Sequence, residues 1–301
     1  MDPQRKMTTL RNAARTFALV LVASLAVAPA AAASYLWEVS SLANRAYLFG
    51  TVHAGKASWY PLPQAVEDAL KDAKVLVVEA DITDAAAMNK SAAAMMYTPP
   101  ASLKTHMPAE EYARFARLLP RYGLPEDQVI QMKPFMAVSL LVLSEWARMG
   151  YLPNYGVDGY LINRAKAEGK PIVEIEGVDS QIRLMDSLSE KELQQLFKGT
   201  LDALQSGLTD EQVNGMVAAW QSGNPDGMLE VARRYNDKIP GAAEFEEKFI
   251  WSRHDPMLEK IDAYLNQSKD RHFIAVGALH LAGPRGLIEM LRKRGYVVRQ
   301  L

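Results

Sequence analysis

The sequence predicts an α/β protein with a central, mostly buried mixed β-sheet and a large helical insertion. Three observations support this fold class. Short apolar runs that are too brief for helices occur towards both ends of the chain. Several of these runs alternate with segments of helical periodicity, which is typical of α/β units. The two stretches assigned to the insertion, about 84–150 and 187–267, contain mainly helical patterns.

The first 33 residues have the pattern of a secretory signal peptide. Arg11 and Arg15 precede an apolar run over 17–28, and the alanines at 31–33 resemble a signal peptidase site. The apolar run is shorter than the ~20 residues that cross a bilayer, which favours a cleaved signal over a membrane anchor. We therefore expect a periplasmic or secreted protein, residues 34–301, with no stable membrane span after cleavage.

The composition excludes several classes of site. The chain contains no cysteine, so disulfides, thiol nucleophiles and thiolate metal sites are excluded. The formal net charge is −1, and charges of both signs are mixed along the chain, so no nucleic-acid partner is expected. The part that follows the signal is long enough to form one large domain.

The predicted mature chain begins with a hairpin, a helix and a strand. Two runs rich in aromatic and apolar residues, 35–40 and 45–49, flank a short polar turn and predict the β-hairpin. Apolar residues at helical spacing predict a helix over 64–71. The compact apolar run within 74–80 is too short for a helix and predicts a buried strand.

The middle of the chain adds a core helix and a third interior strand. Residues 134–149 are strongly apolar, but the segment is shorter than a membrane span and carries Glu145 and Arg148 near its end. A core helix is therefore favoured over a membrane helix. A helix over 156–168 stops at a glycine, and the β-branched run 171–175 that follows predicts the strand.

The chain returns to strands after the second helical stretch. Within that stretch, Ser189 with Glu192 and Thr209 with Gln212 are predicted to form capping boxes at two helix starts. The closing strand, helix and strand are expected over 273–276, 284–294 and 296–299.

Two histidines stand in the same local context. Gly50 to His53 and Gly277 to His280 each form a Gly-x-x-His motif directly after an apolar strand. The glycines let the backbone turn sharply and approach its neighbours closely. Open α/β sheets build their sites beyond the ends of such strands. His53 and His280 are therefore the first candidates for a functional site.

Glu79 is the third candidate, because it ends an apolar run that is expected to be buried. An uncompensated buried carboxylate costs several kcal/mol, so this side chain must be solvated, paired or coordinated. Two imidazoles and a carboxylate could hold a divalent cation with positions open for water. The same groups could also act without a metal, one as general base and another as its orienting partner.

Other polar residues have a structural and a functional interpretation. For Asp158 we favour a helix N-cap over a site residue. Glu176 ends its strand as Glu79 does and could orient an imidazole. Arg253 could stabilise an oxyanion, although a surface ion pair is its default interpretation. The remaining histidines are expected at the surface: His106, His254 and His272.

No motif of a serine hydrolase, a nucleotide-binding loop or a zincin is present. Several motifs taken together resemble the TraB/GumN family. They occur in the same order over nearly the whole predicted mature chain: Leu48–Gly55, Tyr60–Pro63, Val77–Asp81, Gly156–Asp158, Lys170–Val173, Val276–Pro284 and Arg294–Val298.

This resemblance implies kinship with the Tiki proteins, described as manganese- or cobalt-dependent membrane metalloproteases, in which two Gly-x-x-His motifs and a glutamate form the site. Those positions correspond to His53, His280 and Glu79 here. More distantly, it implies a fold like that of erythromycin esterases and the haem-binding ChaN proteins. One departure is that family members often have Arg-Asn where this chain has Arg253 and His254. That departure puts a carried-over role for position 254 in doubt and adds a third imidazole there.

Three functions follow from these residues and this resemblance. The first is a metal-dependent hydrolase, specifically a peptidase acting on a peptide or protein, with manganese or cobalt held by His53, Glu79 and His280. In that case Asp81 or Glu176 could accept the proton, or Glu79 itself if it is not a ligand. The second is a metal-free esterase with His53 as base. The third is a non-catalytic protein that binds haem or another ligand through its histidines.

Overall fold

The computed structural model describes residues 34–236 and 239–301. The predicted signal peptide lies outside the described residues. Residues Ser34–Leu301 form one compact unit. No helix in the described ranges combines the length and the apolar character needed to cross a membrane.

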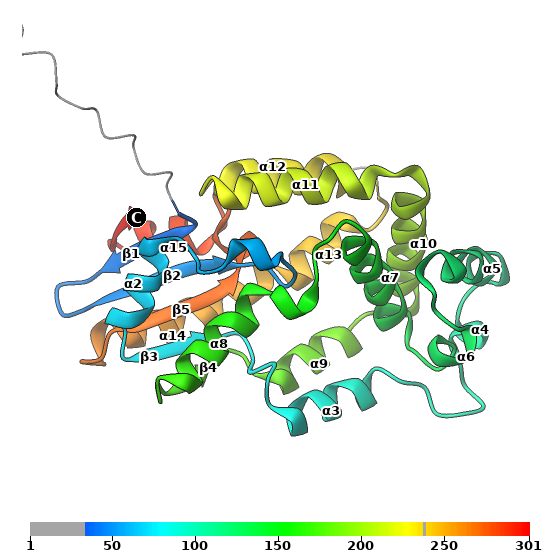
Figure 1. Cartoon of the computed structure of the whole chain (residues 1–301), viewed down its shortest axis with the longest axis horizontal. Helices are drawn as coiled ribbons and strands as arrows, with labels where there is room; N and C mark the ends of the chain where they lie inside the picture. Colours follow the sequence, from blue (N-terminus) through cyan, green and yellow to red (C-terminus); the bar gives the residue numbers. More distant parts are fainter. Residues whose placement is uncertain (1–33, 237–238) are drawn as a thin grey trace, which may run out of the picture. The chain divides into compact units, whose positions relative to one another are not determined.

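A six-stranded mixed sheet forms the centre of this unit, with the strand order β4-β3-β5-β2-β1-β6 (Figure 1). Its strands are β1 (Leu36–Ser40), β2 (Arg45–Thr51), β3 (Val75–Val78), β4 (Ile172–Glu174), β5 (His272–Gly277) and β6 (Val297–Gln300). The hairpin strands β1 and β2 are antiparallel, and β6 adds antiparallel to β1. β4, β3, β5 and β2 are mutually parallel, so their carboxyl ends lie along one edge of the sheet. The predicted α/β class is confirmed.

The strand β5 lies in the most enclosed part of the core. Its side chains are buried at every position from His272 to Val276. Successive side chains of a strand point to opposite faces, so this pattern requires cover on both faces of the sheet. The cover comes from buried residues of α2 (Gln64–Asp72), α8 (Val157–Ala167), α14 (His254–Asn266) and α15 (Leu287–Lys293).

The remaining helices follow β3 and β4 in the chain, and several enclose a second apolar cluster that includes Leu103, Phe115, Leu141, Phe197 and Leu201. They are α3 (Ala85–Ala94), α4 (Leu103–His106), α5 (Ala109–Leu118), α6 (Glu126–Val129), α7 (Pro134–Arg148), α9 (Val178–Asp186), α10 (Glu190–Ser206), α11 (Leu208–Gln221), α12 (Pro225–Asn236) and α13 (Ala242–Phe249). Short 3₁₀ turns occur at η1 (Ala57–Trp59), η2 (Leu119–Tyr122), η3 (Pro153–Tyr155), η4 (Trp251–Arg253) and η5 (Ala278–Leu281). The apolar segment 134–149 forms the packed helix α7, as expected for a core helix.

Three details differ from the expectations. β4 is an edge strand with exposed positions rather than an interior strand, because no further strand of the described residues pairs beyond it. The capping box at Ser189 is present, but Thr209 lies inside α11, whose N-cap is Gly207 in a left-handed conformation (φ 74°). His272 is buried and stacks on Tyr264 instead of being solvated.

The buried carboxylate of Glu145, on α7, is held by three partners. Arg121, Arg148 and Tyr122 each donate a hydrogen bond of 2.7–2.8 Å to it, and its side chain is 2% exposed. Burial raises the pKa of Glu145, but these hydrogen bonds and charges outweigh burial and lower it below its ordinary value.

We expect Glu145→Gln to reduce the free energy of unfolding by about 1–3 kcal/mol at pH 7, because charge-assisted bonds are lost in a buried place. The folded-state pKa is depressed, so this stabilisation is complete above the unfolded pKa of about 4.3 and is lost as pH falls through the folded value. Urea denaturation at pH 7 and pH 3 measures the loss of stability in the variant and its dependence on pH. A difference between wild type and variant that did not shrink at the lower pH would contradict this account.

Candidate active site

The two Gly-x-x-His motifs meet at the carboxyl edge of the sheet. β2 and β5 are parallel neighbours with Thr51 opposite Gly277, so each histidine follows its strand at the same edge. His280 lies in η5 and is buried, whereas the side chain of His53 is 71% exposed. A side chain at Gly277 would come within 3.3 Å of the Glu79 carboxylate, which explains the glycine at this close approach.

Glu79 joins them from the adjacent strand. β3 is the other parallel neighbour of β5, and Glu79 directly follows it. Its Oε1 accepts a hydrogen bond of 2.6 Å from the Gly277 N–H and lies 3.7 Å from His280 Nε2. Burial raises the pKa of Glu79, whereas the positive charge of Arg253 and the hydrogen bond from the Gly277 N–H lower it, and the net shift is downward. The carboxylate is therefore ionised at neutral pH.

Arg253 lies between two carboxylates of this edge. Its guanidinium donates to both Glu79 and Glu176, with Nε 2.8 Å from Glu176 Oε1. It also donates to the carbonyl of Phe249 at 2.8 Å, and its side chain is only 14% exposed. The default interpretation of Arg253 as a surface ion pair is therefore wrong. It is a partly buried clamp that compensates Glu79 and Glu176 together.

His254 is buried beside His280, so its expected surface position is wrong. Its Nδ1 lies 2.8 Å from the carbonyl of Arg285, and its Nε2 lies 2.9 Å from Nδ1 of His280. Burial lowers the pKa of both rings, that of His280 to about 3, so both are neutral. A carbonyl only accepts, so Nδ1 of His254 carries the proton and its Nε2 accepts from Nδ1–H of His280. The lone pair of His280 is thereby placed on Nε2, the atom nearest Glu79.

Asp158 is not the N-cap of α8 and instead lies beside His53 at the candidate site. Gly156 occupies the N-cap position of α8, and the Asp158 carboxylate lies 2.9 Å from Nδ1 of His53. It also accepts a bond of 2.6 Å from the Thr51 hydroxyl. The charge of Asp158, followed by its hydrogen bond, raises the pKa of His53 above its ordinary value. Solvent screens part of this attraction, because the imidazole is largely exposed.

The donor chemistry of these groups suits a divalent metal cation. Nε2 of His280 has a lone pair 3.7 Å from an ionised carboxylate oxygen, an arrangement that a shared cation would stabilise. Nδ1 of each histidine is already held by an acceptor, as is usual for metal-binding imidazoles. In residues 34–236 and 239–301, no group of three or more His, Asp or Glu side chains is spaced ready to hold a metal. His53, Glu79 and His280 would have to draw together to do so.

The sequence carries a signal for the burial of His254 in the spacing of apolar residues around it. The buried positions of α14 are His254, Met257, Leu258, Ile261 and Leu265, which follow helical spacing. His254 is thus on the apolar face. No comparable signal marked Asp158. Two other candidates lie outside these contacts: Asp81 is bonded to Thr83 and Lys166, and His106 is exposed and stacks on Tyr97.

Similarity to known proteins extends over nearly the whole of residues 34–301. The sequence model of the TraB/PrgY/gumN family matches residues 35–300. The uncharacterized protein YbaP of Escherichia coli (strain K12) is 25% identical over 267 residues, which cover 86% of this chain and 93% of YbaP.

Animal relatives are also similar. The metalloprotease TIKI2 of Xenopus tropicalis is 23% identical over 313 residues, 88% of this chain and 59% of that protein. A metalloprotease TIKI homolog of Amphimedon queenslandica is 23% identical over 316 residues, 89% of this chain and 61% of its own length. The matches therefore span only about 60% of these two longer proteins. No solved structure matches.

Proposed function

Because the chain belongs to the TraB/PrgY/gumN family, we propose that it is an exported, metal-dependent hydrolase and specifically a peptidase. The observation that carries the proposal is the convergence of His53, Glu79 and His280 at the ends of three adjacent parallel strands. Relatives named metalloproteases support the reaction class and a peptide or protein substrate.

In this proposal the buried His280 and the largely buried Glu79, together with the exposed His53, would hold the cation. A divalent cation supplies Lewis-acid polarisation of a scissile carbonyl and makes water more acidic. His254 fixes the tautomer of His280, and Asp158 fixes the ring of His53. Arg253 holds the carboxylates of Glu79 and Glu176 in place, and Glu176 is the nearby carboxylate that could accept a proton from water.

The test uses the purified protein. Its metal content is measured, the metal is removed with a chelator, and cleavage of an unstructured protein is followed after adding manganese, cobalt, zinc or magnesium separately. We expect cleavage to disappear on chelation and to return with manganese or cobalt. Absence of metal uptake together with absence of cleavage under every condition would overturn the proposal.

A second candidate is metal-free ester hydrolysis, favoured by the pairing of His53 with Asp158. A carboxylate that orients a histidine in this way is part of the triads of acyl-transfer enzymes. Hydrolysis of a short ester that persists in excess chelator would support it. A haem-binding role is checked on the same sample, since bound haem would produce a Soret band that is lost in His53→Ala.

Asp158→Asn separates the two enzymatic hypotheses by the size of its effect. The amide can accept from the imidazole or from the Thr51 hydroxyl, but its NH₂ group cannot replace the second acceptor oxygen. If Asp158 only orients a ligand, kcat/KM should fall by about 10–100-fold. If it forms a dyad with a general base, the fall should be nearer 10⁴-fold. The control is Asp179→Asn, whose exposed carboxylate pairs with Lys90 on the surface.

A further inference from the structure

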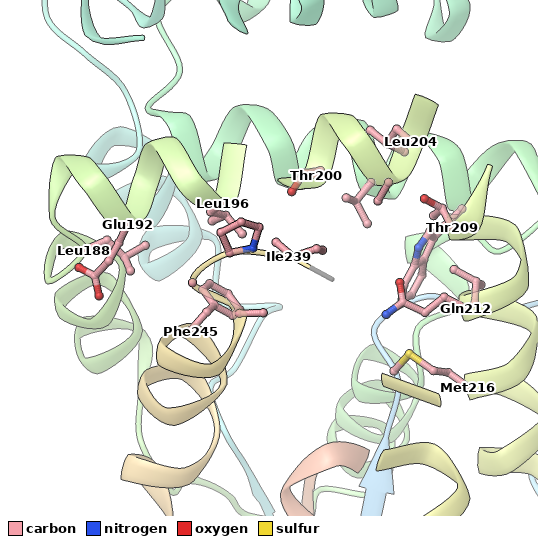
Figure 2. Close-up of a pocket in the computed structure, with 17 residues that line it drawn as sticks. Leu188, Glu192, Leu196, Thr200, Leu204, Thr209, Gln212, Met216, Ile239 and Phe245 are labelled. Atoms are coloured by element: carbon pink, nitrogen blue, oxygen red, sulfur yellow. The ribbon is translucent and has the colours of Figure 1, made fainter. Parts of the chain in front are cut away.

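A cavity of about 240 Å³ lies within the helical region, between α7, α10, α11 and α13. Figure 2 shows Thr209, Gln212 and Met216 of α11 along one wall, with Leu196 and Phe245 on the other side. Most of its lining is aliphatic or aromatic. Glu192 is the charged side chain of the lining, and it is already engaged by Lys248 at 2.7 Å. A charged occupant would therefore be disfavoured.

Three uncharged polar groups line this otherwise apolar space. The hydroxyls of Thr200 and Thr209 and the amide of Gln212 form no hydrogen bond with any described residue. Thr209 is also 94% buried, with 6% of its surface exposed. Thr200 and Gln212 are half-buried, so all three groups are suited to a ligand that has hydrogen-bonding atoms beside an apolar body.

On two sides, residues that line the cavity pack with neighbours of candidate site residues. Trp146 and Val213 pack with Ala54, the residue after His53. On the other side Phe245 stacks on Phe249, whose carbonyl accepts the hydrogen bond from Arg253. Packed residues therefore join the cavity to the surroundings of His53 and Arg253 on two sides.

We propose that this cavity is the specificity pocket of the enzyme and receives a bulky, uncharged apolar side chain of a peptide substrate. This inference rests on the proposed hydrolase function. Dry cavities of ~150 Å³ hold a benzene ring, so about 240 Å³ accommodates a phenylalanine or leucine side chain. The Gln212 amide and the two threonine hydroxyls then bond to the adjoining peptide group.

The first arm of the test compares two peptides that differ at one residue, phenylalanine or aspartate. Thr200→Phe fills the cavity, and Lys191→Phe places the same side chain on an exposed position of the same helix. We expect kcat/KM for the phenylalanine peptide to fall by at least about tenfold in Thr200→Phe and by less than about twofold in Lys191→Phe. Cleavage by Thr200→Phe with an unchanged preference would overturn the pocket assignment.

The second arm measures binding without cleavage. N-acetyl-phenylalaninamide and N-acetyl-aspartic acid amide are titrated into wild type and Thr200→Phe, and the indole N–H of Trp146 is followed by NMR. Binding of the apolar amide alone, lost in Thr200→Phe, supports the pocket even if no peptide is cleaved; in that case only the hydrolase proposal has failed. Equal binding of both amides, or binding of neither, would overturn the pocket. So would binding with unaltered peptide preference, because the cavity would then serve a separate small ligand.

Discussion

Replacing His280 with alanine is expected to reduce peptide cleavage by about 10²–10³-fold, the loss typical of removing one group that stabilises the transition state. His280 is the buried imidazole whose Nε2 faces Glu79 at 3.7 Å, and it would hold the metal from the protein side. The variant should also retain less metal after dialysis. Cleavage rate and metal content, measured on the same preparation, test both expectations.

His254→Ala is the matched variant for this experiment. It removes the acceptor of the His280 Nδ1–H but keeps the proposed ligand, so we expect a smaller loss of about 10–100-fold. His106→Ala, at an exposed position stacked on Tyr97, should leave cleavage unchanged. If His280→Ala kept more than a third of the wild-type rate and its metal, His280 would have no place in the site.

Replacing Arg253 with methionine is expected to reduce the free energy of unfolding by about 3–5 kcal/mol. The change removes the cation shared by Glu79 and Glu176, whose side chains are each 13% exposed. Two largely buried carboxylates would then lose their shared cation, leaving Glu79 with the Gly277 N–H, and the Phe249 carbonyl would lose this donor. Urea denaturation at pH 7 measures this loss, and a change below about 1 kcal/mol would contradict the clamp.

A double variant distinguishes charge repulsion from lost packing. Adding Glu176→Gln to Arg253→Met removes one of the two unpaired charges, so part of the lost stability should return. Arg234→Met serves as the control, because Arg234 pairs with Glu230 on the surface, where an ion pair contributes about 0–1 kcal/mol. Similar losses in the Arg253 and Arg234 variants would show that the buried clamp has no special role.

Local patterns were sufficient to predict most of the sheet and several helices. The runs that form β1, β2, β3 and β5 are apolar and too short to be helices, so they are predicted as buried strands. The predictions were wrong where the position of a segment depends on the segments next to it in the fold. β4 has the composition of an interior strand, yet it lies at the edge because, within the part of the chain that the structure describes, only β3 pairs with it. Thr209 has the spacing of a capping box, but Gly207 terminates the preceding helix and starts the next.

The candidate site, too, was predictable in part from local sequence and in part only from the folded chain. That His53, Glu79 and His280 share one sheet edge was expected, since each follows an apolar strand. The order of the strands depends on pairing between segments more than 190 residues apart. Only the folded chain shows that β2 and β3 lie on either side of β5. The partners that set each histidine's proton, Asp158 and His254, come from helices elsewhere in the chain.

The sequence by itself therefore determined the α/β class, the family and the three residues at the strand ends, because strand length, glycine position and motif order are local properties. Only the tertiary structure decided that Arg253 clamps two carboxylates, that His254 is buried against His280 and that Asp158 holds His53. Hydrogen-bond partners and burial depend on what packs opposite a side chain, and that information is absent from the local pattern around it.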